Sequence, residues 1–256
     1  MTVAMRAMVA ELDDPAFRPV SATTLFCSPV PDGPLEIRVE VLRRGNAAIQ
    51  MRAALSSTRQ PGPGLEVSAT FARERVGPDM LAARTHGLGG PDDAEDAGDR
   101  EMSLAKMGVI PFFCHFEMRL AHGPAFWRAE WEGGEARSAF WYRYRVAQRD
   151  AVTGQNDPLA IPPIADTMPP ALLVRLGPDA ERIYAPSLDL TVHFLESTSS
   201  EWLLVDVRCP RAIAGCATAR ADIWDDAGKL IATATQTMML RRDPRRAAGG
   251  RGPVVL

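Results

Sequence analysis

The alternation of apolar and polar residues predicts two sets of β-strands along the chain. In residues 35–45, LEIRVEVLRRG, apolar residues alternate with glutamate and arginine, which is the period of a strand with one face in solvent. Gly45 and Asn46 then suit a tight hairpin turn. The other strands predicted in this first set are residues 21–30, 46–57 and 65–75. The four strands, joined by turns, predict an antiparallel meander.

The residues before this first set, MTVAMRAMVAELDD, predict a helix. Alanine, methionine and glutamate favour helix formation. One side of the predicted helix collects Val3, Ala7, Ala10 and Leu12. The first half of the chain is therefore expected to contain one helix followed by four strands.

The second half of the chain repeats this order. Strands are predicted for residues 108–123, 138–148, 188–197, 201–213, 215–228 and 229–242. A proline-rich helical segment, residues 156–177, precedes the last four, and residues 19–30 resemble residues 185–196. A helix laid across a curved antiparallel sheet is the hotdog fold. The predicted fold class is therefore α+β, a double hotdog in which two long antiparallel sheets each wrap around a helix.

The stretch between the two halves breaks the strand pattern. Residues 77–103 combine glycine and proline with six acidic residues between Asp92 and Glu101, which predicts a flexible, solvated linker. Binding of a basic partner is the alternative interpretation. The predicted domains are thus an N-terminal hotdog, residues 1–76, and a C-terminal hotdog, residues 104–242. Residues 243–256 lack periodicity and are expected to be disordered.

Composition limits the classes of function that fit. The chain has 256 residues, of which 46% are hydrophobic and 24% charged, the balance of a soluble globular protein with a substantial core. Its net charge of -3 does not favour nucleic-acid binding, which usually needs a basic surface. No apolar run reaches about 18 residues, so we expect no membrane span. Arg6 interrupts the apolar start and no cleavage site follows, so we expect no signal peptide and a cytoplasmic location.

Cysteine and histidine spacing gives no support for a metal site or for disulfides. No two of the cysteines have CxxC spacing, and each lies among strand-like apolar residues: Cys27, Cys114, Cys209 and Cys216. The histidines form no HxxxH or HExxH pattern: His86, His115, His122 and His193. We therefore predict buried thiols in a reducing compartment, and neither a metal nor a cofactor.

One polar residue stands out in the last predicted strand, KLIATATQTMMLRR, residues 229–242. Gln236 shares a strand face only with apolar residues, namely Ala232, Ala234, Met238 and Leu240. Burying an unpaired amide costs on the order of 1–3 kcal/mol, so Gln236 needs hydrogen-bond partners. Those partners are either the backbone, which makes Gln236 structural, or groups of a functional site.

Three motifs resemble the acyl-CoA thioesterase II family of double-hotdog proteins. They are IADTMPPALLVRL (164–176), APSLDLTVHFLESTSSEWLLVDV (185–207) and ADIWDDAGKLIATATQTMMLRR (221–242). The resemblance covers roughly residues 1 to 242 and is stronger in the second half. It implies hydrolysis of an acyl-CoA without metal, cofactor or covalent nucleophile. The chain begins inside the first helix, where family members usually have a preceding strand, so the first hotdog is expected to be incomplete.

The same resemblance implies three catalytic residues: Asp166 in the helix, Ser187 before the LD strand and Gln236 in the last strand. Ser187 departs from the threonine of the best-known members but keeps the hydroxyl. In the mechanism so implied, Asp166 acts as the base or orients the water, Ser187 and Gln236 hold that water, and helix amides stabilise the oxyanion.

The residues alone leave simpler roles open for two of these positions. Asp166 lies between a Pro-Pro pair and Pro169-Pro170, which predicts the start of a helix. A carboxylate at a helix start can be an N-cap with no catalytic role. Ser187 can be a turn hydroxyl bonded to its own backbone.

Two other functions remain to be weighed. An enoyl-CoA hydratase of this fold needs a catalytic histidine where GQNDPLAIPP carries Ala160, so hydration is disfavoured. A non-catalytic protein that binds acyl-CoA or acyl chains is the main alternative. An apolar tunnel between the hotdogs is expected to hold the acyl chain, closed by residues that can equally be core: Phe112, Phe113, Phe116 and Met118. Unpaired edge strands predict a homodimer or larger oligomer.

Overall fold

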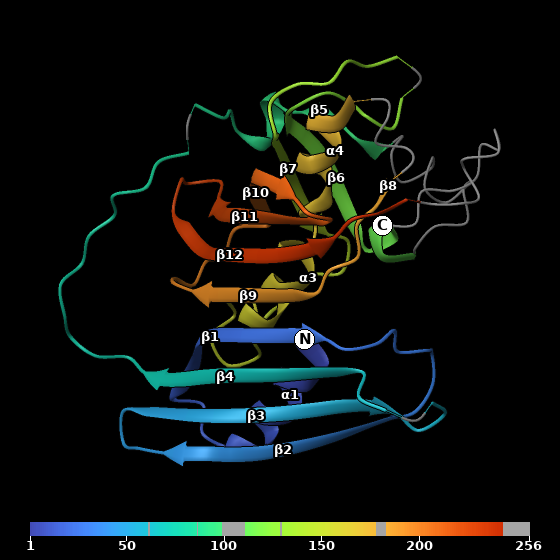
Figure 1. Ribbon diagram of the computed structural model, residues 1–256. Helices are drawn as coiled ribbons and strands as arrows, with labels where there is room; N and C mark the ends of the chain where they lie inside the picture. Colours follow the sequence, from blue (N-terminus) through green and yellow to red (C-terminus); the bar gives the residue numbers. More distant parts are fainter. Residues whose placement is uncertain (61, 86, 99–110, 129, 178–182, 243–256) are drawn as a thin grey trace.

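A single large sheet with helices on one face dominates the molecule (Figure 1). The computed structural model describes residues 1–256 except 61, 86, 99–110, 129, 178–182 and 243–256. The first half of the chain forms α1 (Thr2–Leu12), β1 (Phe17–Phe26), β2 (Leu35–Arg44), β3 (Ala48–Ser57) and β4 (Leu65–Arg73). His86, the end of the predicted linker, residues 108–110 of the next predicted strand and the predicted tail lie outside the described residues.

The second half has more elements than the first. After the short elements η1 (Pro91–Asp93), β5 (Glu95–Asp96) and η2 (Pro111–His115) come β6 (Phe116–His122) and β7 (Arg137–Tyr144). The helical region consists of η3 (Pro158–Ala160), α3 (Ile161–Ala165) and α4 (Pro169–Leu176). The last elements are β8 (Ile183–Tyr184), β9 (Asp189–Phe194), β10 (Trp202–Ile213), β11 (Cys216–Asp225), β12 (Leu230–Met239) and β13 (Arg241–Arg242).

The main strands form one continuous sheet. Its eleven strands run in the order β2-β3-β4-β1-β9-β12-β11-β10-β7-β6-β5. The prediction of two separate sheets is wrong, because β1 pairs with β9 and so neither strand is left as an unpaired edge in the middle of the molecule. Away from this pair the order β1-β4-β3-β2 is matched by β9-β12-β11-β10, which agrees with the repeat expected from the sequence.

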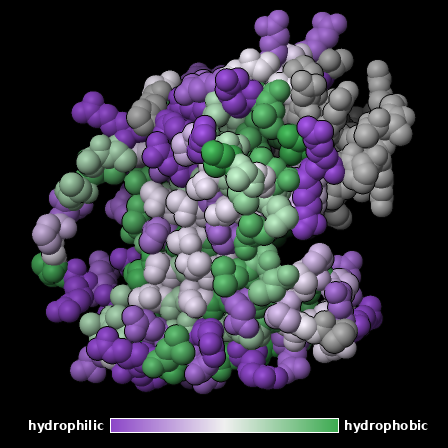
Figure 2. Space-filling view, in the orientation of Figure 1, coloured by the Kyte–Doolittle hydropathy of each residue, from purple (hydrophilic) through white to green (hydrophobic). Residues whose placement is uncertain are grey.

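Hydroxyl side chains cover the middle of the sheet on the face turned away from the helices. Ser68, Thr23, Thr191 and Thr235 lie in register on four neighbouring strands. The hydroxyls of Thr23 and Thr191 are hydrogen-bonded at 2.9 Å. Figure 2 shows pale residues of intermediate hydropathy over these strands. The hydrophobic core therefore lies on the opposite face, beneath the helices.

The helix α1 packs against β2, β3 and β4 of the first half. Its buried side consists of Ala4, Met5, Met8 and Leu12. The side predicted from Val3, Ala7, Ala10 and Leu12 is wrong by about two fifths of a turn: Leu12 is buried, but Val3 is 52% exposed. The long, flexible methionine side chains fill the space over the strands, so the methionine spacing defines the buried side better than valine and alanine do.

The predicted helical segment 156–177 contains two α-helices, with a break at residues 166–168. Pro169 and Pro170 have no backbone N–H, so they cannot donate to the carbonyls of Ala165 and Asp166. The helix α3 therefore ends, and α4 starts at Pro169 and packs against β7, β10 and β11. This break places Asp166 in a turn.

The predicted linker differs from expectation in its later part, where the chain lies against the sheet. The strand β5 pairs with β6, and Ala97, which is fully buried, donates its N–H to the carbonyl of Met118 at 3.0 Å. Residues 95–97 of the predicted linker are therefore held at the edge of the sheet, because β6 supplies backbone partners that composition does not reveal, while most of residues 89–98 stay exposed to solvent.

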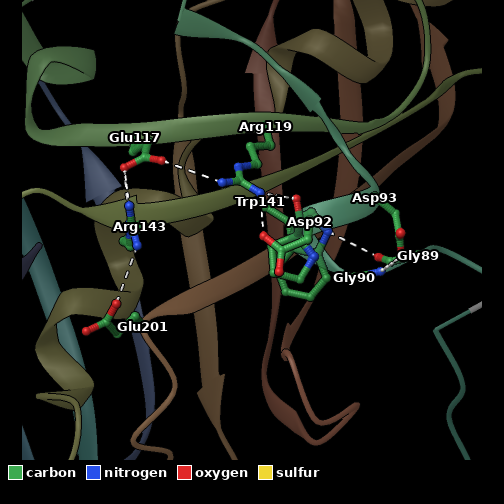
Figure 3. A network of polar contacts seen from close by, with 10 residues as sticks. Gly89, Gly90, Asp92, Asp93, Glu117, Arg119, Trp141, Arg143 and Glu201 are labelled. Carbon is green, nitrogen blue, oxygen red and sulfur yellow. Dashed lines mark hydrogen bonds and ion pairs between the residues drawn. The ribbon is translucent and has the colours of Figure 1, made fainter.

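Side chains also hold this segment, which we call the strap (residues 89–98) (Figure 3). Arg119 Nη1 donates to the carbonyl of Pro91 at 2.6 Å and to Asp92 Oδ1 at 2.8 Å. Trp141 Nε1 donates to the carbonyl of Gly89 at 3.2 Å. The strap thus covers a small apolar cluster on the outer face of β7 and β10, which includes Trp141.

The cysteines are free thiols, but only one of them is buried as predicted. Cys209 is buried, whereas Cys27, Cys114 and Cys216 are exposed. The exposed cysteines lie beside strand ends or on the solvated sheet face, where an apolar sequence neighbourhood does not imply burial. Among the described helices, none is both long and apolar enough to cross a membrane.

Candidate active site

Asp166, Ser187 and Gln236 converge on one point of the core side of the sheet. Gln236 Nε2 donates hydrogen bonds to Asp166 Oδ1 and to Ser187 Oγ, the latter at 2.8 Å. Ser187 Oγ donates to Asp166 Oδ1 at 3.0 Å. The three side chains come from a turn between helices, the approach to β9 and the middle of β12, and they form a closed triangle of hydrogen bonds.

The backbone fixes Ser187 beside β12. Leu188 donates its N–H to the carbonyl of Thr237 at 2.8 Å, and Met239 donates to the carbonyl of Pro186 at 3.0 Å. Ser187 itself forms an isolated antiparallel bridge with Met238. Its hydroxyl therefore points across to its neighbours and is bonded to Asp166, whereas the turn-hydroxyl alternative required a bond to its own backbone.

Gln236 is fully buried on β12, with 0% of its surface exposed. Its amide nitrogen is paired with Asp166 and Ser187 side chains, which argues against a purely backbone-tied structural amide. The carbonyl oxygen Oε1 has no hydrogen-bond partner among the described residues. A buried amide oxygen without a partner costs roughly 1–3 kcal/mol, so this atom is ready to accept a hydrogen bond from a small ligand or water.

Asp166 lies at the C-terminal end of α3, as its C-cap residue, three positions before the first residue of α4. The prediction that it lies at a helix start is wrong, because the Pro-Pro pair Pro169-Pro170 begins the next helix without a side-chain cap, with Met168 as its N-cap. Burial raises the pKa of Asp166 to about 6, against the hydrogen bonds from Ser187 and Gln236 and the positive charge of the Met1 amino group, which lower it.

The first turn of α4 does not offer amides for an oxyanion. Pro169 and Pro170 carry no N–H, and the N–H of Ala171 already donates to the carbonyl of Met168 at 3.3 Å. The expectation that amides of this helix stabilise an oxyanion is therefore wrong for its first three residues. The proline pair, which suggested a helix start in the sequence, is also what removes the donors.

Two cavities in the described part of the chain lie away from this triangle. One, of about 390 Å³, lies near the end of β7 and has a mixed lining of charged and apolar residues, among them Arg143, Arg145 and Ile161. The other, of about 220 Å³, is lined in part by Phe116 and Met118. None of Asp166, Ser187 and Gln236 lines either cavity.

The residues expected to close an acyl tunnel belong to the core, although Phe116 and Met118 also line the smaller cavity. Phe113, Phe116 and Met118 are buried in the main cluster, and Phe112 packs against it. Phe112 contacts Phe113 edge-to-face, with ring centroids 5.1 Å apart. The alternative that these aromatics are core is the one the packing supports.

Sequence analysis missed two polar neighbours of the site, Tyr142 and Thr167. Both are buried, and Tyr142 donates to Thr167 Oγ1 at 3.2 Å beside Asp166. Thr167 directly follows Asp166 in the IADTM motif, but nothing in the sequence indicates that a tyrosine from β7 reaches it.

A curved antiparallel sheet laid over helices is the architecture of the hotdog-fold class of proteins. Solved structures agree. The acyl-CoA thioesterase II TesB2 from Mycobacterium marinum is 21% identical over 95% of this chain and 89% of that chain, with a TM-score of 0.70. A hot dog fold protein of unknown function from Alicyclobacillus acidocaldarius is 20% identical over 94% and 86%, with a TM-score of 0.73.

These distant structures show the fold, and matches to two family models identify the family. The acyl-CoA thioesterase N-terminal domain matches residues 1–72, and the acyl-CoA thioesterase C-terminal domain matches residues 90–240. The chain belongs to the acyl-CoA thioesterase family and is a thioester hydrolase. No curated protein sequence matches it.

Proposed function

We propose that the protein hydrolyses an acyl-CoA to a free fatty acid and CoA, with a water molecule positioned by Asp166, Ser187 and Gln236. The single observation that carries this proposal is the buried, unpartnered Oε1 of Gln236 next to the Asp166 carboxylate. An acceptor and a base side by side are what a nucleophilic water needs. We take the two repeated halves, residues 1–76 and 104–242, as the two units of a double hotdog.

In the proposed reaction, the water donates one hydrogen bond to Gln236 Oε1 and the other to Asp166 Oδ2. Ser187 and Gln236 both bond Oδ1, so Oδ2 is the carboxylate oxygen open to the water. The water oxygen attacks the thioester carbonyl carbon while its proton moves to Asp166. Collapse of the tetrahedral intermediate breaks the C–S bond, and Asp166 returns the proton to the leaving thiolate of CoA.

The electrostatics of Asp166 suit this role. With a pKa of about 6 the carboxylate is mostly ionised at neutral pH, yet it is a stronger base than an exposed aspartate.

The test is to measure CoA release from a panel of acyl-CoAs with a thiol reagent, for the wild type and for Asp166→Asn and Gln236→Ala. We expect the wild type to release CoA and both variants to lose about 10²-fold or more in kcat. Variants that hydrolyse acyl-CoAs as fast as the wild type contradict the assignment of these residues.

The second candidate is a protein that binds acyl-CoA or acyl chains without turnover. The observation in its favour is that none of the three side chains lines either of the two cavities of about 390 and 220 Å³ described above. Calorimetric binding of an acyl-CoA together with no CoA release in the same buffer supports this candidate over the enzyme.

A further inference from the structure

The helix α3, whose C-cap is Asp166, is too short to hold its own shape. It has five residues, Ile161–Ala165, and two of them are prolines without an N–H. Isolated helices shorter than about 12–15 residues are marginal in water. Contacts from elsewhere in the fold must therefore fix both this helix and the turn that follows it.

Two tyrosines of β7 provide such contacts, one at each end of α3. Tyr144 donates its hydroxyl hydrogen to the carbonyl of Ala160, just before the helix, at 2.7 Å. Tyr142 donates to Thr167 Oγ1, just after the helix, at 3.2 Å. The two tyrosines are two residues apart on one strand, so they lie on the same face of the sheet.

The bond from Tyr142 is the first of a short chain that closes the turn around Asp166. Thr167 Oγ1 accepts from Tyr142 and in turn donates to the carbonyl of Ile164 at 2.7 Å. Asp166 lies between Ile164 and Thr167, and its own N–H bonds the carbonyl of Pro162 at 3.1 Å. The backbone on both sides of Asp166 is thereby tied to a rigid strand.

We propose that Tyr142 and Thr167 are positioning residues for the reaction: their buried hydrogen-bond chain holds the Asp166 carboxylate against Ser187 and Gln236. The proposal rests on the proposed function, because it assigns a role to residues around the same carboxylate. Neither side chain bonds Ser187 or Gln236, so both act through the backbone of Asp166.

The hydrogen-bond chain from Tyr142 through Thr167 to Ile164 is buried, which allows it to fix the position of Asp166. Tyr142 is 2% and Thr167 8% exposed, so water does not easily replace either hydroxyl. The water site needs the Asp166 oxygens placed against two fixed partners on β12 and before β9. A displacement of about 1 Å of a catalytic group can reduce turnover about 10²-fold.

The experiment compares four variants of the full chain over a range of acyl-CoA concentrations, so that both kcat and KM are measured. Tyr142→Phe and Thr167→Val each remove one hydroxyl with little change of shape, and we expect each to lower kcat at least about tenfold with KM unchanged. Their double variant is expected to lose no more than the worse single variant, because both break one chain. Thr167→Ser keeps the hydroxyl and is expected to restore kcat to within about threefold of the wild type.

Tyr144→Phe is the matched control, since it removes the same kind of hydrogen bond from the same strand, at the end of α3 away from Asp166. We expect its melting temperature to fall about as much as that of Tyr142→Phe, while kcat stays within about threefold of the wild type. Equal losses of kcat in Tyr142→Phe and Tyr144→Phe, or a Thr167→Ser as slow as Thr167→Val, overturn the proposal and make the chain merely structural.

Asp166→Asn in the same assays separates this inference from the function on which it rests. If Asp166→Asn keeps full activity, the proposed function fails. If Asp166→Asn is inactive while Tyr142→Phe and Thr167→Val turn over like the wild type, only the positioning role fails.

Discussion

Gln236 and Asp166 lie 70 positions apart in the chain, and Gln236 Nε2 donates a hydrogen bond to Asp166 Oδ1. The bond joins the last long strand of the sheet to a turn between two helices. Since Gln236 is fully buried, the pair also brings a carboxylate into a poorly solvated place, and the behaviour of that carboxylate can be measured.

The first prediction concerns the pH dependence of activity. Burial raises the pKa of Asp166 to about 6, and only its ionised form can take a proton from water. We therefore expect kcat/KM to fall as pH drops through about 6 and to be level above about 7. Assays of CoA release between about pH 5 and pH 8 check this, and a profile that stays flat down to about pH 5 removes Asp166 from the role of base.

The second prediction separates the two partners of that carboxylate. The hydrogen bond from Ser187 lowers the pKa of Asp166, so Ser187→Ala should move the acid limb of kcat/KM to higher pH, in addition to lowering kcat about tenfold. Ser187→Thr keeps the hydroxyl and should leave the acid limb in place. An unchanged limb in Ser187→Ala contradicts the hydrogen bond of 3.0 Å between Ser187 and Asp166.

The third prediction is a gain of stability when the carboxylate is removed. The folded-state pKa of Asp166 is above its ordinary value of 3.8, so the native state binds more protons than the unfolded state between about pH 4 and pH 6. The contribution of Asp166 to the free energy of unfolding is therefore fully present below about pH 4 and is lost as the pH rises through about 6. Asp166→Asn avoids this loss, and we expect it to raise the free energy of unfolding at pH 7 by up to roughly 3 kcal/mol.

Urea denaturation of the wild type and Asp166→Asn at about pH 7.5 and pH 4 checks the sign, because the advantage of the variant should disappear at the lower pH. A variant that is less stable than the wild type at both pH values shows that the charge is well compensated. The gain in stability together with a loss of turnover is the trade-off expected where a site keeps a strained charge.

Several parts of this architecture follow from local patterns in the sequence. The alternation of residues 35–45 and the turn at Gly45 place β2 and its hairpin within a few residues. The apolar neighbours of Gln236 correctly indicate that it is buried. These features depend on period and turn chemistry, which act over short distances along the chain.

Other parts depend on which distant segments meet, and local patterns do not encode that. Nothing in residues 21–25 indicates that β1 pairs with β9 to make one sheet. The contact of Tyr142 with Thr167 likewise joins β7 to the turn after α3. The buried side of α1 is a different case, because the spacing of Met5 and Met8 is present in the sequence and indicates the side that is buried.

The last prediction concerns the strap, residues 89–98, and contrasts the bond from Arg119 to the strap backbone with the ion pair between Arg119 and Asp92 (Figure 3). Arg119 bonds both the carbonyl of Pro91 and the carboxylate of Asp92, and its guanidinium lies 4.7 Å from the ring centroid of Trp202. The side chain of Asp92 is 94% exposed, so its ion pair with Arg119 is screened by solvent. The backbone bond and the aromatic contact should therefore matter more than the ion pair.

We expect Arg119→Ala to lower the free energy of unfolding by about 1–3 kcal/mol and to increase cleavage within the strap by a protease, because it removes a bond to the backbone and a cation–π contact together. Asp92→Ala, the matched control, should cost less than about 1 kcal/mol and leave proteolysis unchanged. Chemical denaturation with limited proteolysis of both variants decides the point. If Asp92→Ala increases cleavage of the strap as much as Arg119→Ala does, the prediction is wrong, and the ion pair between Arg119 and Asp92 is what holds the segment.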